Sequence, residues 1–141
     1  MRPGEILRRF WDLVADRRYD DAVALLDPAG TFFSRPIGTV PMEAFIYIMR
    51  AVQGSAPMTF SFQTEMENGN SAMMEMEGFG TFPSGELYNN NYVWVAEVRD
   101  GLIHNLREYS DSAYSGEVFG RNLAPEIQQT FGEIIAKAQA N

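Results

Sequence analysis

The sequence predicts an α+β fold in which helices pack on one face of a curved, mostly antiparallel sheet. Apolar residues recur at helical spacing through most of the first fifty residues, and from about Met58 onward the apolar period changes from 3.6 to 2. Two dipeptides that favour hairpin turns, Asn68-Gly69 and Asp100-Gly101, separate the alternating segments. Helices followed by a strand meander are typical of α+β domains.

Three helices are predicted in the N-terminal third. The first runs from Glu5 to about Asp16, with one apolar stripe of Ile6, Leu7, Phe10, Trp11 and Val14. A second, short helix runs from about Tyr19 to Leu26 and ends at Asp27-Pro28, because the residue before a proline is pushed out of the α region. Thr31 to Ser34 follows as a short strand, and Pro41 to about Val52 is the third helix.

Four strands and a last helix are predicted after Pro57. The strands cover about 58–67, 71–81, 87–99 and 102–111. The third of them is apolar on both faces beyond Asn91, which predicts a central strand covered on both sides. Pro125 to about Ala138 is a helix with its apolar residues aligned. We expect one domain over residues 1–141, with a core of about 5–120 and a C-terminal helical extension of about 122–139.

Composition excludes several classes of function. The formal net charge is −8, with 19 acidic residues against 11 lysines and arginines, so nucleic acids and anionic membranes are not expected partners. The sequence has no cysteine, which removes thiolate chemistry and fits a reducing cytoplasm. With one histidine and no tightly spaced ligand set, neither a metal site nor a cofactor is expected. We find no signal-peptide pattern and no apolar segment near the ~20 residues that span a bilayer.

The chain resembles the nuclear-transport-factor-2-like superfamily over roughly 5–120. The resemblance lies in the helix pair before YDDAVALLDPAGTFF, in the turn at Gly38, and above all in YVWVAEVRDGLIHNLREYSD. The last segment is similar to the polyketide-cyclase (SnoaL-like) and limonene-epoxide-hydrolase branch. The resemblance implies a cone-shaped sheet wrapped around the N-terminal helices, an apolar pocket at the open end of the cone, and a homodimer.

Residues that carry the chemistry in this superfamily are retained only in part. Glu108 falls where the epoxide-hydrolase-like branch has an acidic proton donor or base, but Gly78 to Gly80 stands where that branch has an Arg-x-Asp pair. The related ketosteroid-isomerase branch has an aspartate base where this chain has Arg35, and a tyrosine where it has Phe10 or Trp11. In the cyclase-like branch an aspartate in the region of Asp111 is the acid or base, so the register decides between Glu108 and Asp111.

Strand alternation gives the candidate catalytic residues. His104, Leu106, Glu108 and Ser110 share one face of the last strand, so Glu108 points into the cone if Leu106 does. A carboxyl surrounded by apolar side chains has a raised pKa and suits acid–base chemistry, although a salt bridge at the sheet rim is the alternative. His104 is the natural base near neutral pH, yet its position beside a turn favours a surface or dimer contact. Asp111 fits an N-cap at Ser112 as well as a catalytic acid.

The candidate binding residues lie on neighbouring elements. Asn90, Tyr92 and Trp94 alternate toward the same interior, where they either orient and enclose a substrate or belong to the core. Arg35 lies near the pocket mouth, where it either binds the substrate or forms a rim salt bridge. The expected apolar lining is Trp11, Met49, Met76 and Leu106.

Three functions therefore stay open. The first is a cofactor-free isomerase, cyclase, dehydratase or hydrolase that acts on an apolar, oxygenated small molecule by general acid–base chemistry. The second is a non-catalytic ligand-binding or dimeric scaffold protein of the same fold. The third, which has the weakest support, is a protein-interaction module like the namesake of the superfamily.

Overall fold

The computed structural model describes residues 1–140 and confirms the α+β class. Its strands are β1 (Leu26–Ser34), β2 (Gly38–Pro41), β3 (Thr59–Asn68), β4 (Ser71–Thr81), β5 (Leu87–Arg99) and β6 (Leu102–Ser110). They form one sheet in the order β2-β1-β6-β5-β4-β3. Strands β1 and β6 pair in parallel and every other neighbouring pair is antiparallel.

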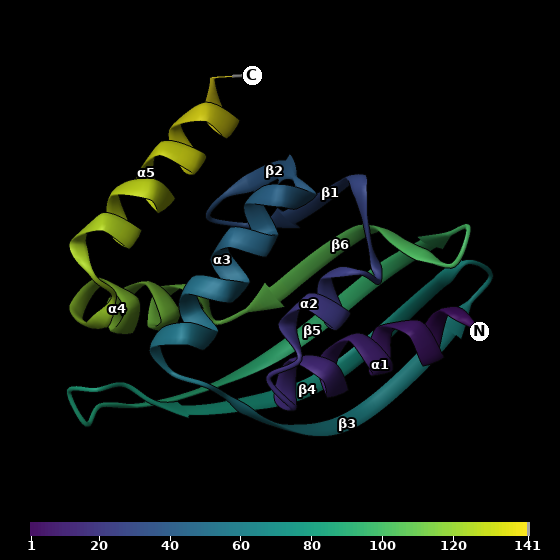
Figure 1. Ribbon diagram of the computed structural model, residues 1–141, viewed down its shortest axis with the longest axis horizontal. Coiled ribbons are helices and arrows are strands. Elements are labelled where there is room, and N and C mark those ends of the chain that lie inside the picture. Colours follow the sequence, from purple (N-terminus) through teal and green to yellow (C-terminus); the bar gives the residue numbers. More distant parts are fainter. Residues whose placement is uncertain (141) are drawn as a thin grey trace.

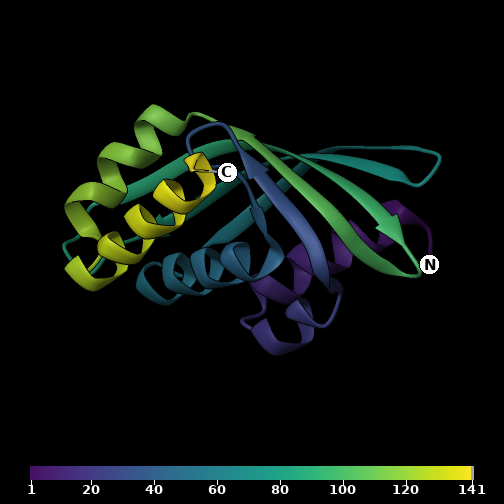
Figure 2. The same cartoon turned by 90° about the horizontal axis from the view of Figure 1, so that it is seen from above.

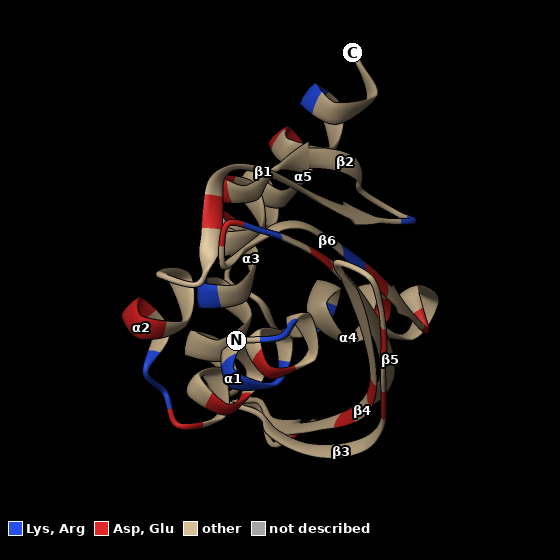
Figure 3. Ribbon diagram, turned by 90° about the vertical axis from the view of Figure 1, so that its right-hand side faces the viewer, with Lys and Arg blue, Asp and Glu red and all other residues tan. Residues whose placement is uncertain are grey.

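Five helices accompany the sheet: α1 (Pro3–Ala15), α2 (Tyr19–Val23), α3 (Met42–Ser55), α4 (Ser112–Asn122) and α5 (Pro125–Gln139). The sheet curves around α1, as the view in Figure 3 shows. Helix α3 lies beside β1 and β2, and α4 and α5 lie at the opposite end from the N-terminus (Figures 1 and 2). The concave face of the sheet therefore has helices along its whole length.

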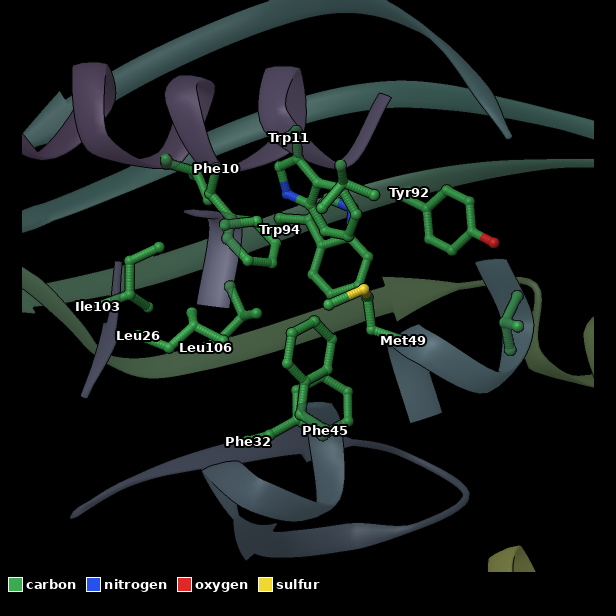
Figure 4. Packing of buried hydrophobic residues seen from close by; sticks show 14 of the residues in the cluster. Phe10, Trp11, Leu26, Phe32, Phe45, Met49, Tyr92, Trp94, Ile103 and Leu106 are labelled. Atoms are coloured by element: carbon green, nitrogen blue, oxygen red, sulfur yellow. The ribbon is translucent and has the colours of Figure 1, made fainter. Parts of the chain in front are cut away.

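Helix α1 forms because its sequence supplies both a start signal and one apolar face. Pro3 sits in the first turn, and the Glu5 carboxylate accepts a hydrogen bond from the Arg2 N–H at 3.3 Å. Six side chains of this helix are buried against the sheet: Ile6, Leu7, Phe10, Trp11, Leu13 and Val14. Figure 4 shows Phe10 and Trp11 reaching from α1 toward Trp94 of β5. The core is thus built between the first helix and the middle of the sheet.

The two predicted hairpin turns differ in type. Asp100 and Gly101 both have positive φ, at 52° and 76°, as a type I′ turn requires. In the β3–β4 hairpin Asn68 still pairs with Ser71, so the turn residues are Gly69 and Asn70. Only Gly69 has a positive φ, which is the pattern of a type II′ turn. Asn68 therefore belongs to β3, and the turn begins one residue later than the Asn68-Gly69 dipeptide indicates.

Several predicted boundaries are wrong near the chain reversals. Helix α2 ends at Val23 and not at Leu26, because Leu26 pairs with Ile103 and starts a longer β1 that includes Asp27-Pro28. Gly38 to Pro41 forms the short edge strand β2. Helix α4 was not predicted. Its sequence, SAYSGEVFGRN, has two glycines and buries only Val118, so it lacks a clear apolar stripe.

Strand β5 is central, but only its inner face is covered within the chain. Residues of the inner face are buried from Tyr88 to Val98, whereas Val93 and Val95 on the outer face are half-buried. The expectation that both faces are covered is therefore not met within the described chain. Among residues 1–140, no helix combines the length and apolar character needed to cross a membrane.

Candidate functional site

A cavity of about 390 Å³ lies between the concave face of the sheet and helices α3, α4 and α5. This volume is within the range of roughly 300–1,000 Å³ that small-molecule sites occupy. Most of its lining is apolar, and it includes aromatic side chains from α1, α3, β1, β3 and β5. Polar groups come from strands β1, β5 and β6 and also from helices α3, α4 and α5.

Aromatic rings form one side of the cavity. Trp11 and Trp94 pack with ring centroids 4.5 Å apart, and Phe32 and Phe45 pack at 4.7 Å. Figure 4 shows these rings in one continuous cluster between α1, β5 and α3. Aromatic contacts at these distances stabilise beyond the area that they bury, by about 0.5–1.5 kcal/mol per pair. This side of the cavity is consequently a rigid wall that also belongs to the core.

Glu108 of β6 is the acidic group of the cavity. It is the pairing partner of Trp94 on β5 and of Ser34 on β1, so the three side chains lie on the same inner face. Burial raises the pKa of the Glu108 carboxyl to about 7. The carboxyl keeps some exposure because it borders the cavity, while protein atoms surround its other sides. No hydrogen bond joins it to another side chain within residues 1–140, so the group is free to bind a ligand.

Ser34 is a polar residue of the site that the sequence reasoning missed. It is 2% exposed and lines the cavity beside Glu108, and its hydroxyl has no hydrogen-bond partner in the described chain. A buried hydroxyl without a partner costs about 1–3 kcal/mol of stability. A ligand in the cavity that bonds the Ser34 hydroxyl would offset this cost, which fits a role of Ser34 in ligand binding. The available signal was its place at the end of Thr31-Phe32-Phe33-Ser34, where alternation puts Phe32 and Ser34 on one face.

Three other polar side chains in the cavity wall already have partners. Gln53 accepts a hydrogen bond from the Met58 N–H at 3.0 Å. Ser115 donates to the Ser112 carbonyl, and Gln128 donates to the Leu123 carbonyl at 2.8 Å. These groups hold the helices and loops around the cavity and are not free for a ligand.

Two tyrosines of β5 form a hydrogen-bonded pair in the cavity wall. The hydroxyls of Tyr88 and Tyr92 are 2.6 Å apart, and Asn90 donates to the Tyr88 hydroxyl at 3.0 Å. Burial raises the pKa of Tyr88 to about 12 and that of Tyr92 further, so both remain protonated. The pair has two hydroxyl hydrogens and uses one in its mutual bond. The other is available to an oxygen in the cavity, and Figure 4 shows the Tyr92 hydroxyl directed away from the tryptophans.

Asn90 does not line the cavity, although the sequence places it on the inner face. It is 4% exposed, and its amide bonds the Asp111 main chain as both donor and acceptor, at 3.0 and 3.3 Å. With the bond to Tyr88, these contacts tie β5 to the junction between β6 and α4. The expected role in substrate binding is therefore replaced by a structural one.

Replacing Asn90 with alanine is expected to lower the free energy of unfolding by about 2 kcal/mol, since the Asp111 main chain and the buried Tyr88 hydroxyl lose a partner. Urea denaturation measures the loss. The matched control is Asn91→Ala on the exposed neighbour, which should change stability by less than about 0.5 kcal/mol. Equal effects in the two variants would contradict the structural role of Asn90.

Asp111 is the N-cap of α4. Its carboxylate accepts a hydrogen bond from the Tyr114 N–H at 3.1 Å, and its side chain is exposed. It lies outside the residues that line the cavity. The structure thus favours the capping interpretation of Asp111, and it leaves Glu108 as the acid that faces the cavity.

Asp111→Ala should cost about 1 kcal/mol of stability, because the first turn of α4 loses its cap. For a chain of this length that corresponds to a fall of about 3 °C in Tm. Asp111→Asn keeps an oxygen that can cap the helix and is the control. A Tm for Asp111→Ala equal to that of the wild type would argue against the cap.

His104 lies outside the cavity because β6 has a bulge. Asn105 pairs with Glu97 and Ile103 pairs with Val98, so His104 is the additional residue and does not share the inner face of Leu106. Its Nε2 faces the Arg99 guanidinium at 3.2 Å and its Nδ1 lies 2.9 Å from Asp27. Because arginine only donates, Nε2 accepts and Nδ1 donates to Asp27. This bond, with the Ala29 N–H, holds the pKa of Asp27 below its usual value.

Of the other expected binding residues, some line the cavity and some do not. Trp11, Tyr92, Trp94, Met49 and Met76 line the cavity. Leu106 is fully buried beneath it and does not border it. Arg35 is exposed and lines a small neighbouring cavity of about 80 Å³, which it shares with Ser34 and Glu108.

Helices α4 and α5 form one wall of the cavity, and the sequence predicted only the second of these helices. Phe119 and Leu123 come from α4 and its C-terminal end, and Phe131, Ile134 and Ile135 come from α5. The aligned apolar residues of the last helix were visible in the sequence, whereas helix α4 was not. Among the described residues, no group of three or more histidine, cysteine or acidic side chains is placed to hold a metal ion.

Comparison with known proteins places this geometry in a family. The profile of the SnoaL-like domain matches residues 7–105, which is more than half of the chain. A search of curated proteins finds no significant match.

Solved structures share the fold at low sequence identity. A candidate polyketide cyclase of Pseudomonas putida has a TM-score of 0.74 at 15% identity, over 88% of this chain and 99% of its own. A candidate isomerase of Bacillus subtilis has a TM-score of 0.71 at 20% identity, over 84% and 93%. An LEH-like epoxide hydrolase of M. tuberculosis has a TM-score of 0.70 at 16% identity, over 85% and 90%. Identities this low show the fold alone, and with the profile match they establish that the chain belongs to the SnoaL-like family.

Proposed function

We propose that the chain is a small-molecule enzyme in which Glu108 transfers a proton to or from an uncharged, mostly apolar substrate that carries a carbonyl or hydroxyl oxygen. The observation that carries the proposal is the Glu108 carboxyl itself, which borders the cavity, has no hydrogen-bond partner in the described chain, and has a pKa of about 7. Near neutral pH both its acid and its base forms are populated, which suits general acid–base catalysis.

The lining supports an uncharged substrate. Among the described residues, no lysine, arginine or histidine borders the main cavity, and the chain carries a net charge of −8. A carboxylate or phosphate on the ligand would therefore lie near Glu108 without a compensating cation, which is unfavourable in an apolar site. An oxygen near Glu108 has one hydroxyl hydrogen of the Tyr88–Tyr92 pair and the Ser34 hydroxyl available on the same face of the sheet.

The reaction belongs, in this proposal, to the isomerase, cyclase, dehydratase or hydrolase type. Names of similar structures, which include a polyketide cyclase, an isomerase and an epoxide hydrolase, are consistent with this range. An epoxide hydrolysis that needs an Arg-x-Asp pair at Gly78 to Gly80 is disfavoured. A Cβ at Gly78 would lie 3.2 Å from the Tyr92 ring, and one at Gly80 would lie 3.1 Å from the Ala56 carbonyl oxygen.

A second candidate is a ligand-binding protein without catalysis. It is favoured by the isolation of Glu108, because no other acid and no histidine borders the main cavity in the described part of the chain. A single carboxyl without an orienting partner binds a hydroxyl or carbonyl group as readily as it moves a proton.

Deuterium exchange separates the two candidates without knowledge of the natural substrate. Decan-2-one in D₂O exchanges the hydrogens beside its carbonyl when a base removes them, and NMR follows the loss of proton signal. The enzyme proposal expects exchange above the buffer rate with saturation in ketone concentration. Saturable binding of the ketone without added exchange, together with no opening of an alkyl epoxide, supports the binding protein instead.

For the assembly we propose a cytoplasmic homodimer that needs neither metal nor cofactor. The outer face of the sheet carries half-buried Val93 and Val95 and exposed Phe79 and Tyr109, an apolar surface that a second copy would cover. A monomer mass in sedimentation at micromolar concentration would exclude the dimer.

A further inference from the structure

Helix α5 has an apolar face that the rest of the chain leaves only half-buried. None of its residues is buried, although Ile127, Phe131, Ile134 and Ala138 pack partly against the core. Three apolar residues of this helix, Phe131, Ile134 and Ile135, line the cavity. The matched family profile ends at residue 105, so α4 and α5 lie beyond the part that the profile describes.

Three glycines lie on the same wall of the cavity. Gly116 and Gly120 are one turn apart on α4, and Gly132 is in the middle of α5. A glycine inside a helix is less stable than alanine by about 1 kcal/mol, so each of these positions is unfavourable for the helix itself. A Cβ at any of the three would meet no other atom within 4 Å. Close packing of the helices therefore does not require glycine there, and the three exposed positions border the open space of the cavity.

The polar groups lie on a different wall. Ser34 is 2% exposed with an unpartnered hydroxyl, and Glu108 and Ser110 stand beside it at the ends of β1 and β6. The α4–α5 wall presents Phe119, Leu123, Phe131, Ile134 and Ile135 around the glycines. The cavity thus offers hydrogen-bonding groups without partners on one wall. The α4–α5 wall is mostly hydrocarbon and glycine backbone, and its Ser115 and Gln128 side chains already donate to main-chain carbonyls.

We propose that Gly116, Gly120 and Gly132 keep open a chamber for the hydrocarbon tail of an elongated, uncharged ligand whose single oxygen lies near Glu108 and Ser34. This inference names the ligand class of the site proposed above and rests on that proposal for the position of the oxygen. Side chains at the three glycines set the length of tail that fits, so they determine specificity and take no part in proton transfer.

Binding of a homologous series of ligands tests the chamber directly. N-phenyl-1-naphthylamine, an uncharged dye that fluoresces in apolar sites, serves as the reporter, and straight-chain primary alcohols from hexanol to dodecanol displace it. Each additional buried methylene contributes about 0.8 kcal/mol, which is about a fourfold gain in affinity. The wild-type chain should show this gain along the series until the tail reaches the end of the chamber.

Leucine at Gly120 or at Gly132 should shorten the accepted tail. The four added carbon atoms occupy the chamber, so dodecanol should bind at least about tenfold more weakly than to the wild type, while hexanol changes by less than about twofold. Gly54→Leu is the matched control, because Gly54 is an exposed helical glycine of α3 with no atom within 4 Å of its Cβ and lies outside the cavity wall. Leucine favours the helix over glycine, so the variants should fold, and circular dichroism checks this. If a leucine variant misfolds, Gly132→Ala repeats the test with a smaller expected shift.

Three results would overturn the inference. The first is an identical chain-length dependence in the wild type, Gly120→Leu and Gly132→Leu. The second is a wild-type chain that binds neither the dye nor any alcohol of the series. The third is a leucine variant that changes oligomeric state with unchanged alcohol affinity, which would assign the wall to a subunit contact. Absence of deuterium exchange alone would contradict the enzyme proposal but not the chamber. In the same way, Glu108→Gln should keep the wild-type dependence of alcohol affinity on tail length.

Discussion

Replacing Glu108 with glutamine is expected to lower turnover by about 10²- to 10⁴-fold while the fold and ligand affinity persist. A positioned general acid or base contributes an acceleration of this size, and glutamine keeps the shape of the side chain but cannot act as an acid or a base near neutral pH. The variant changes no hydrogen bond to a neighbouring side chain in residues 1–140, because the Glu108 carboxyl makes none there. The measurement is the rate of deuterium exchange of decan-2-one, with circular dichroism to verify the fold.

Control variants distinguish Glu108 from the other acid that the sequence suggested. Asp111→Asn keeps the helix cap and should retain wild-type turnover, because the Asp111 carboxylate bonds the Tyr114 N–H and lies outside the cavity lining. If Glu108 acts as the base, the wild-type rate should rise with pH and level off above about 7. Undiminished exchange in Glu108→Gln, or its loss in Asp111→Asn alone, would assign the proton transfer to another group.

The inward position of Glu108 was predictable because β6 has no bulge between Leu106 and Ser110. Alternation from Leu106 to Ser110 holds, since the pairs with β5 run without a break from Asn105 to Ser110. The same rule failed for His104, two residues before Leu106, because the strand gains one residue there. A Cβ at Gly30 would lie 2.2 Å from the His104 carbonyl oxygen, so the bulge also depends on a glycine in the neighbouring strand β1. Alternation along β6 alone could not predict this bulge, because the bulge depends on a residue of the neighbouring strand.

Asn90 and the α4–α5 wall show a second limit of prediction from sequence. Strand alternation correctly placed Asn90 on the inner face. Its side chain bonds the Asp111 backbone because the chain leaves β6 there and α4 starts at Ser112, and α4 was not predicted. That helix has glycines at two positions of its cavity side, which removes the apolar periodicity by which helices are recognised. The residues that shape the cavity are thus the ones that obscure the secondary structure.

Glu108→Gln should also stabilise the fold at neutral and alkaline pH. The pKa of Glu108 is about 7 in the folded chain against 4.5 for the unperturbed group. Between these values the folded state binds more protons than the unfolded state, so the wild type loses stability as pH rises through this window. Each pH unit between the two pKa values lowers the free energy of unfolding by about 1.4 kcal/mol. Burial of the carboxylate therefore costs on the order of 3 kcal/mol above pH 7, and water that solvates it in the cavity reduces this cost. Glutamine carries no charge and avoids this cost.

Urea denaturation of both proteins from pH 4.5 to 8.5 tests this expectation through the difference in their free energies of unfolding. The rest of the chain is identical in the two proteins, so its contribution cancels in that difference. Among the described residues, the ionisable side chains around Glu108 are Tyr88 and Tyr92, which stay protonated, and Arg35 in the small adjoining cavity. The variant should match the wild type near pH 4.5 and exceed it progressively up to pH 7. A difference that does not vary with pH would mean that Arg35 or water stabilises the carboxylate, and the base form of Glu108 would then be too weak for the proposed chemistry.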